Sequence, residues 1–190
     1  MRYSKNEKIL QGNWKKGWAL DHHMDLYPKR TEIGEMLYQL KYKNDRSKIE
    51  PLATKAYDFM KTRLVTKWLF CIVPVPPSDN TRVFQPVIEL AKLLGKKLNI
   101  EINNDCLQKI KNTEIMKNNE MSAKEKEKKL NGAFRIKDKT FENKKILLFD
   151  DIFQTGSTLK EITRAMYEEG NVQNVYALTI TKTTTKKGSI

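Results

Sequence analysis

The sequence predicts an α/β fold in which helices flank a parallel β-sheet. Short apolar runs alternate along the chain with longer amphipathic segments, as expected where strands are joined by helices. The clearest runs are continuously apolar, which is typical of strands buried on both faces of a parallel sheet. The chain has 190 residues, 39% of them hydrophobic and 31% charged. It is therefore long enough to bury a core and has the composition of a globular protein.

Residues 1–65 carry two helical patterns but no long apolar run. The first 30 residues are rich in aromatic and basic side chains and predict irregular structure. From Thr31 the apolar residues share one helical face, which predicts a first helix. These apolar residues are Ile33, Leu37 and Leu40. The spacing Ser47-x-x-Glu50 is that of a capping box and predicts a second helix that ends near residue 64. We expect this part of the chain to form a helical segment, or hood, next to an α/β core.

The core predicted for residues 66–190 alternates between strands and helices. Its strands are expected at residues 69–73, 98–102, 146–149 and 175–180, and its main helices at residues 86–98 and 157–169. Pro86 stands where proline favours the start of a helix, and Gly170 is a typical helix stop. Residues 107–133 are polar and rich in lysine, and they contain a short helix predicted by the capping box Ser122-x-x-Glu125.

The chain is strongly basic. It has 36 Lys and Arg residues against 23 Asp and Glu residues, a formal net charge of +13. This excess favours anionic partners, either phosphorylated small molecules or nucleic acid, although single lysines usually belong to solvated faces. No apolar run approaches the roughly 20 residues of a membrane span. The charged start, and two cysteines (Cys71 and Cys106), fit a cytoplasmic protein without a secretory signal or a disulfide framework.

The candidate binding site lies where a predicted strand ends and the next helix begins. Its residues are Asp150, Asp151, Ile152, Phe153, Gln154, Thr155, Gly156, Ser157 and Thr158. Ligands of open parallel sheets bind beyond the carboxyl ends of the strands. The backbone N–H groups at the start of the helix point toward an anion there, and the helix dipole favours negative charge. Gly156 allows close approach of the backbone, and the neighbouring hydroxyls can donate as well. The segment therefore predicts a phosphate site.

Two carboxylates beside a phosphate site would repel the phosphate unless they bind another group. Sugar hydroxyls donate strong hydrogen bonds to ionised carboxylates, and a phosphorylated ribose offers hydroxyls and a phosphate together. A simple helix cap next to a solvated strand end is the alternative interpretation. A receiver-like phosphoacceptor site would also place acids at strand ends, but it does not need the hydroxyl-rich loop. The absence of a G-x-x-x-x-G-K-[ST] motif excludes a Walker A loop.

The segment from Ile146 to Leu159 resembles the phosphoribosyl pyrophosphate motif of type I phosphoribosyltransferases. In that motif hydrophobic residues precede two acids and a T-G-x-T loop. The resemblance implies that Asp150 and Asp151 hold the ribose 2- and 3-hydroxyls and that the loop from Thr155 to Thr158 holds the 5-phosphate. Gln154 stands where the family most often has threonine, so one hydroxyl contact of the family is missing here.

Residues 72–136 resemble the ComF-type, competence-associated members of that family. The matching segments are Val73-Pro74-Val75-Pro76, Arg82-Val83-Phe84-Gln85, Lys109-Ile110-Lys111-Asn112-Thr113, Leu130-Asn131 and Gly132-Ala133-Phe134, with Leu40-Lys41-Tyr42 upstream. The resemblance implies a pyrophosphate loop made of Val75, Pro76, Pro77 and Ser78. It also implies a mobile lid over residues 107–133, from which Lys109 and Lys111 reach the departing pyrophosphate. No cysteine precedes residue 71, so the zinc segment of these relatives is not transferred.

Three functions remain open at this stage. The resemblance implies a phosphoribosyltransferase, a glycosyltransferase of nucleotide metabolism. It would bind phosphoribosyl pyrophosphate with Mg²⁺, which is held mainly by the ligand and water, and transfer the phosphoribosyl group to an unknown acceptor with release of pyrophosphate. The alternative is a ComF-like accessory protein that binds single-stranded DNA in DNA uptake or processing and uses the site for ligand sensing. The third is an interaction module with a vestigial site.

The amino-terminal segment bears on the choice between these functions. Trp14-Lys15-Lys16-Gly17-Trp18 favours nucleic acid, because aromatic rings between cations can stack bases, although a packed hood over the site is a competing interpretation. The adjacent His22 and His23 are expected to be ordinary surface residues. The oligomeric state, the acceptor and the metal ligands are not predicted.

Overall fold

The computed structural model describes residues 8–25, 28–77, 83–111 and 123–183. Its strands are β1 (Lys8–Ile9), β2 (Lys16–His22), β3 (Cys71–Pro74), β4 (Glu101–Ile102), β5 (Leu107–Lys109), β6 (Phe134–Ile136), β7 (Lys145–Phe153) and β8 (Asn174–Lys182). Its α-helices are α1 (Glu32–Tyr42), α2 (Ile49–Met60), α3 (Pro86–Leu98), α4 (Ala123–Leu130) and α5 (Ser157–Glu168). Short 3-10 helices are η1 (Arg46–Lys48), η2 (Thr66–Trp68) and η4 (Lys139–Phe141). None of the helices in the described ranges has the length and apolar character that a bilayer span requires.

The main sheet has the strand order β1-β2-β8-β7-β3-β4. From β2 to β4 all neighbouring strands are parallel, whereas β1 runs antiparallel to β2. A separate antiparallel pair is formed by β5 and β6. The predicted α/β class, with a mostly parallel sheet flanked by helices, is therefore confirmed.

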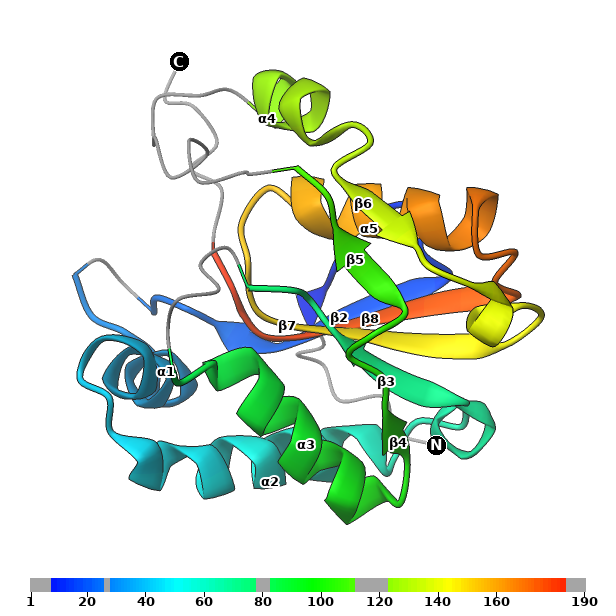
Figure 1. Ribbon diagram of the computed structural model, residues 1–190. Helices are drawn as coiled ribbons and strands as arrows, with labels where there is room; N and C mark the ends of the chain where they lie inside the picture. The colour runs from blue at the N-terminus through cyan, green and yellow to red at the C-terminus, as the bar shows by residue number, and fades with distance from the viewer. Residues whose placement is uncertain (1–7, 26–27, 78–82, 112–122, 184–190) are drawn as a thin grey trace.

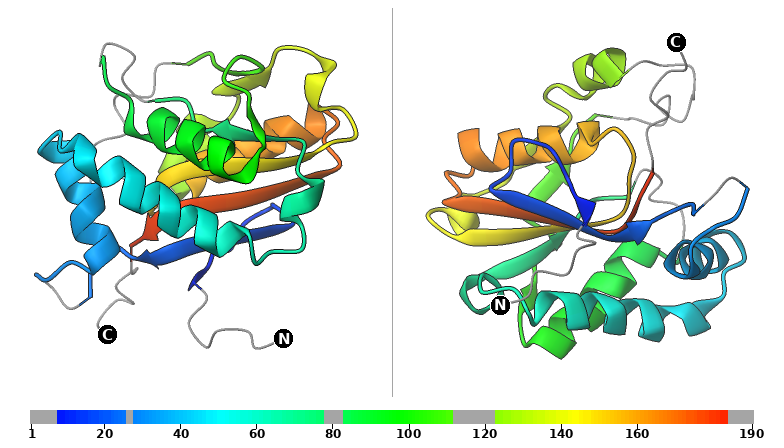
Figure 2. Two further views of the ribbon diagram at one scale, coloured as in Figure 1. Left: turned by 90° about the horizontal axis from the view of Figure 1, so that it is seen from below. Right: turned by 180° about the vertical axis from the view of Figure 1, so that it is seen from behind.

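Both faces of the main sheet are covered (Figure 1). The helices α1, α2 and α3 pack on one face, and α5 packs on the other with the β5–β6 pair beside it, as the two views of Figure 2 also show. Along β7, Ile146 and Leu148 belong to the core on the α5 side, and Leu147 and Phe149 to the core under α1–α3. Successive side chains of a strand point to opposite faces, so burial of both faces explains the continuous apolar runs in the sequence.

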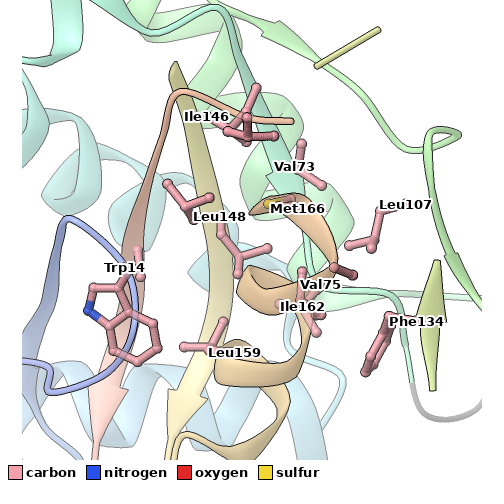
Figure 3. Close-up of a cluster of buried hydrophobic side chains, with 14 of the residues drawn as sticks. Trp14, Val73, Val75, Leu107, Phe134, Ile146, Leu148, Leu159, Ile162 and Met166 are labelled. Carbon is pink, nitrogen blue, oxygen red and sulfur yellow. The ribbon is translucent and has the colours of Figure 1, made fainter. Parts of the chain in front are cut away.

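The core on the α5 side joins segments that are far apart in the sequence (Figure 3). Leu159, Ile162 and Met166 lie on the inward stripe of α5 and pack against Leu148 of β7 and Val73 of β3. Each of these side chains is at most 2% exposed. Burial of a side chain of this size contributes about 1.5–3 kcal/mol relative to exposure. This packing fixes the position of α5 over the sheet and hence the position of its first turn.

The predicted helices are confirmed with small changes at their ends. The hydroxyl of Thr31 accepts a hydrogen bond from the N–H of Gly34 at 3.0 Å, so α1 begins where the apolar spacing begins. Helix α3 has its predicted bounds, with Pro86 in its first turn and Asn99 in the left-handed conformation (φ 55°) at its end. Because α3 runs on to Leu98, the strand predicted from residue 98 is shortened to β4.

The capping box predicted at Ser47 is wrong. Asp45 accepts hydrogen bonds from the N–H and the hydroxyl of Ser47 at 3.1 and 2.6 Å, and thereby caps η1 rather than α2. The carboxylate of Glu50 instead binds the ammonium of Lys97 at 2.6 Å, which links α2 to α3. Helix α4 lies where the second capping box predicted a helix, but its Ser122 lies outside the described residues.

The prediction of irregular structure before residue 30 is also wrong, because residues 16–22 form β2 beside β8. Trp18 is 2% exposed and stacks on Tyr176, with ring centroids 6.3 Å apart. Trp14 is 7% exposed, and its indole N–H donates to the carbonyl of Leu10 at 3.1 Å. Both rings are core side chains, so they are not available to stack bases. The strand escaped detection because Trp18 and Ala19 are embedded among Lys, Asp and His and form no apolar run.

Candidate functional site

The strand order creates a topological switch point between β3 and β7. The chain leaves β3 through α3, on one face of the sheet, and reaches β4. It leaves β7 through α5, on the opposite face, and reaches β8. The strands β3 and β7 are parallel neighbours, with Pro74 paired to Phe149. In open α/β sheets ligands bind outside the carboxyl ends of the two strands at such a point.

The two predicted acids lie at this carboxyl edge, within β7 rather than after it. Asp150 pairs with Thr179 of β8, and the strand continues to Phe153. The alternation along β7 places Asp150 on the α5 face and Asp151 on the face covered by α1. An ion pair confirms the second placement, because the ammonium of Lys41, on α1, lies 2.6 Å from a carboxylate oxygen of Asp151. The side chains of Lys41 and Asp151 are 21% and 13% exposed, so this pair is largely shielded from water.

Asp150 ionises less readily than a free aspartate does. Burial and the negative charge of Asp151 raise the pKa of Asp150 to about 8, against the opposing effects of the Asp151 N–H and of Lys41. That N–H donates to the Asp150 carboxylate at 2.8 Å. Burial alone would lower the pKa of Lys41, but the charges of Asp151 and Asp150 outweigh it and raise that pKa. The ammonium of Lys41 therefore acts on both carboxylates, but it contacts only Asp151 directly. Its weaker effect on Asp150 does not offset burial and the charge of Asp151.

Lys41 is the site residue that the sequence analysis missed. Its only sequence signal was the match of Leu40-Lys41-Tyr42 to a helix end of the ComF-type proteins, to which no role was attached. It reaches the site because Leu37 and Leu40 are fully buried against the sheet, which holds α1 next to the carboxyl edge.

His23 also lies beside the acids, contrary to the expectation of an ordinary surface residue. Its ring nitrogen Nδ1 is 3.3 Å from the hydroxyl of Thr181 on β8. Burial, and then the positive charges of Arg30 and Lys41, lower the pKa of His23, while Asp151 acts in the opposite direction. This imidazole is half-buried and neutral near pH 7. It follows β2 directly, so its position could not be inferred without recognising that strand.

The predicted phosphate loop leads directly into the first turn of α5. Gly156 is left-handed (φ 76°) and precedes α5, and having no side chain it cannot cap the helix itself. The N–H of Ser157 donates to the hydroxyl of Thr155 in a long contact of 3.4 Å. The hydroxyls of Thr155 and Ser157 lie 2.9 Å apart and bond to each other, and Ser157 is 4% exposed. The first N–H groups of a helix have no partner within the helix and can bind an anion. The binding of a phosphate by residues 155–158 stays a prediction.

The structure gives two reasons for a glycine at position 156. A Cβ atom at this position would lie 2.6 Å from the ring of Phe153. That ring meets Trp14 edge-on, with centroids 6.1 Å apart, and packs on the core of the α5 side. The closest neighbour of the missing side chain is thus the protein itself, and the positive φ adds a second constraint.

The remaining predicted residues divide between two places. The N–H of Val75 donates to the carbonyl of Phe149 at 2.8 Å, so Val75, Pro76 and Pro77 leave the sheet at the same edge as the acids. Ser78 lies outside the described residues. Lys109 ends β5 in the hairpin on the α5 side, and the ammonium of Lys111 donates to the carbonyl of Asn131 at 2.6 Å. Lys111 therefore contacts the segment after α4.

That segment is tied to the first half of α5. The N–H of Gly132 donates to the carboxylate of Glu161 at 2.7 Å, and Lys160 pairs with Glu127 of α4 at 2.7 Å. Within the ranges that the structure describes, no three His, Cys, Asp or Glu side chains are grouped so that they could hold a metal ion.

The protein has an α/β fold, and two acids and the start of α5 lie at the carboxyl edge of its parallel sheet. No family model matches the chain. It is 26% identical over 163 residues to competence protein F of Haemophilus influenzae, which covers 83% of this chain and 69% of the relative. It is 25% identical over 169 residues to competence protein ComFC of Bacillus subtilis, which covers 85% of this chain and 64% of that relative. These similarities support a ComF-type relationship for the chain.

Proposed function

We propose that this chain is a ComF-like accessory protein of DNA uptake or processing whose carboxyl-edge site binds phosphoribosyl pyrophosphate. The first half of the proposal is supported by the names of the two similar proteins, both of which are competence proteins. The second half is supported by one observation above all. Two acids and the start of helix α5 lie together at the β3–β7 switch point, as a ligand with sugar hydroxyls and a phosphate requires.

The ligand would bind in a defined order of groups. Its 5-phosphate accepts hydrogen bonds from the backbone of residues 155–158, and the ribose hydroxyls donate to Asp150 and Asp151. The pyrophosphate lies toward the Val75-Pro76-Pro77 segment, together with Mg²⁺. Magnesium usually keeps several waters and few protein ligands, so it needs no preformed cluster of carboxylates in the chain.

In the absence of ligand, Lys41 holds one of the two acids. Its ammonium pairs with Asp151, so ligand hydroxyls have to share that carboxylate with Lys41 or displace the ammonium from it. Binding of a sugar therefore repositions Lys41, which belongs to α1 and not to the phosphate loop. This connection offers a way to signal the presence of ligand, as the sensing role requires.

The second candidate function is transfer of the phosphoribosyl group to an acceptor. Asp150 favours it, because burial and the charge of Asp151 raise its pKa to about 8, close to the operating pH of an acid–base catalyst. In such a reaction the bond between ribose C1 and pyrophosphate breaks, a bond from C1 to the acceptor forms, and the acceptor's proton passes to Asp150 in its ionised form, which predominates above about pH 8. Release of pyrophosphate on addition of candidate nucleobases would distinguish transfer from sensing.

Thermal unfolding with added ligands tests the site. Phosphoribosyl pyrophosphate with Mg²⁺ should raise the melting temperature, because a ligand at 100 times its Kd stabilises the folded state by about 2.7 kcal/mol. Ribose 5-phosphate should give a smaller rise and pyrophosphate alone the smallest. Asp150→Asn with Asp151→Asn should abolish the response to all sugar ligands, whereas Lys137→Gln, on an exposed residue of the α5 side, should retain it. An unchanged melting temperature of the wild type with every ligand would refute the site.

A further inference from the structure

A cluster of exposed aromatic and basic side chains lies at the opposite edge of the sheet from the acids. We call it the aromatic–basic surface, and it consists of the exposed Lys67, Trp68, Phe70 and Lys144 and the half-buried Lys145. It lies where β3 and β7 begin, and the N–H of Phe70 donates to the carbonyl of Lys145 at 2.8 Å. In Figure 1 the start of β3 is on the right, and the loop from β7 to α5 is on the left. The two sites are thus separated by the length of the strands.

The aromatic rings of this surface are exposed although large apolar side chains are usually buried. Trp68 is 61% exposed and Phe70 is 41% exposed. The ammonium groups of Lys67 and Lys145 lie 5.2 and 5.6 Å from the centre of the Trp68 ring, and that of Lys144 lies 5.1 Å from the centre of the Phe70 ring. Trp14 and Trp18 are buried, so Trp68 is the one tryptophan that presents its ring to solvent.

A basic cavity continues this surface. It has a volume of about 550 Å³ and lies between the ends of α2 and α3. Its cationic lining residues are Lys61, Arg63, Lys67 and Lys97. Lys67 belongs to both the cavity and the aromatic–basic surface. Lys61 and Lys97 pair with Asp58 and Glu50, whereas Lys67, Lys144 and Lys145 have ring contacts and no ion pair with a carboxylate of the described ranges.

We propose that the aromatic–basic surface binds single-stranded nucleic acid. Bases stack on Trp68 and Phe70, and the phosphates on either side meet Lys67, Lys144 and Lys145. Alternation of exposed rings and cations is the chemistry that single strands require, because every unpaired base offers a flat face and every nucleotide a negative charge. The cations of the cavity extend the positive path beyond Lys67. A duplex hides its base faces, so it would use the lysines but not the rings. The proposal rests on the DNA-binding part of the proposed function and gives it a location.

Titration of the full chain with a labelled oligo(dT) of about 16 nucleotides tests the surface. The wild type should bind, with quenching of Trp68 fluorescence and with an affinity that falls as salt rises, at a slope of about −0.7 per neutralised phosphate. Trp68→Ala should weaken binding about 5- to 100-fold and remove the quenching. Lys67→Gln, Lys144→Gln and Lys145→Gln together should make the slope shallower by about 2. The matched control removes three charges from the α5 side through Lys128→Gln, Lys137→Gln and Lys139→Gln, and it should keep the Trp68 quenching.

Three outcomes would overturn the proposal in different ways. Equal loss of affinity in the two triple variants would mean that the affinity for nucleic acid depends on net charge and not on this surface. The DNA part of the proposed function would then still stand. No binding by the wild type at low salt would remove both. Two results would reassign the surface to a protein partner, if Trp68→Ala abolished them. One is self-association of the chain. The other is binding of an acidic peptide such as poly-glutamate for which oligo(dT) does not compete. The phosphoribosyl pyrophosphate response should be unchanged in Trp68→Ala, so failure of one site is distinguishable from failure of the other.

Discussion

The ion pair between Lys41 and Asp151 leaves the neighbouring carboxylate in an unusual state. Two adjacent acids near the end of a buried strand repel each other, and a single ammonium cannot satisfy both. Asp151 has the direct contact, at 2.6 Å, and Asp150 has only the N–H of its neighbour. The pKa of Asp150 is consequently raised to about 8, whereas a free aspartate titrates near 3.8. Hydrogen bonds donated by a hydroxyl-rich ligand favour the ionised form of Asp150, so binding of such a ligand should lower this pKa.

The first prediction follows from the sign of this pKa shift. Between about pH 4 and pH 8 the folded protein holds a proton on Asp150 that the unfolded chain has lost, so the free energy of unfolding contributed by this group falls as pH rises through that window. Asp150→Asn removes the titration. It should increase the free energy of unfolding at pH 8 by about 1–3 kcal/mol relative to wild type, and change it little at pH 4.

Urea denaturation of both proteins at pH 4, 6 and 8 measures this difference. Asp151→Asn is the control, because it leaves the largely buried Lys41 without its partner and should lower the free energy of unfolding instead. Lys41→Met in the Asp151→Asn background should restore part of that loss. If the free energy of unfolding changed with pH in the same way in wild type and Asp150→Asn, Asp150 would be ionised at neutral pH and the prediction would be wrong.

At the scale of elements, the start of α5 depends on one glycine. Gly156 combines a positive φ of 76° with a close approach to the Phe153 ring. The ring is fixed by its edge-on contact with Trp14, whose position depends in turn on the amino-terminal turn before β2. The predicted phosphate loop is therefore positioned by a segment that precedes it by about 140 residues in the chain.

The second prediction concerns Gly156→Ala. A left-handed residue with a Cβ costs about 1–2 kcal/mol, and displacement of the Phe153 ring adds to that cost. We expect a loss of about 2–4 kcal/mol in the free energy of unfolding and loss of the response to phosphoribosyl pyrophosphate. Gly132→Ala is the matched control, since Gly132 also has a positive φ (66°) but a Cβ there would meet only the Lys111 side chain, at 3.5 Å.

Gly132→Ala should therefore lose only the conformational part, and its ligand response should be that of the wild type. Addition of Phe153→Leu to Gly156→Ala should recover part of the stability by giving the new methyl group room. If Gly156→Ala and Gly132→Ala lowered the free energy of unfolding equally, the close approach to Phe153 would not contribute to the cost of the substitution.

The sequence predicted those elements whose pattern is local. The positions of two strands and two helices follow from the apolar runs before Pro74 and Asp150 and from the apolar stripes of α3 and α5. The loop from Thr155 to Thr158 marks the predicted site. Local pattern could not predict β2, because its burial comes from pairing with β8 rather than from its own hydrophobicity. It also could not predict the contacts of Lys41 and His23 with the site, since these depend on how α1 and β2 pack on the sheet. The hairpin of β5 and β6 was missed because each strand has only three residues.

On the scale of the whole molecule, the two proposed sites lie at opposite ends of the same strands. The carboxyl edge of β3 and β7 holds the acids and the phosphate loop, and their amino edge holds the aromatic–basic surface. The net charge of +13 favours anions at both edges. Near Asp150 and Asp151 the negative charge of the acids opposes this general attraction. An anion that binds there therefore needs the backbone N–H donors at the start of α5. At the amino edge the surface is open, and affinity there should be dominated by salt-sensitive contacts.

The last prediction concerns the place of the amino-terminal segment in the fold. If residues 1–65 were a separable hood, removal of residues 1–22 would spare the sheet. In the structure β2 covers the edge of β8, and Trp18, at 2% exposure, packs with Leu178 and Ile180 in the core under α1–α3. Trp18→Ala should therefore lower the free energy of unfolding by about 3–5 kcal/mol.

Trp68→Ala offers a control with the same change of side chain at an exposed position, and it should alter stability by at most about 0.5 kcal/mol. Removal of residues 1–22 should abolish cooperative unfolding, because it uncovers β8 as an open sheet edge and exposes apolar side chains that favour aggregation. Guanidinium denaturation followed by circular dichroism distinguishes the cases. A cooperative transition in the truncated chain, with wild-type slope, would show that the sheet is complete without β2 and that the first 22 residues are an appendage.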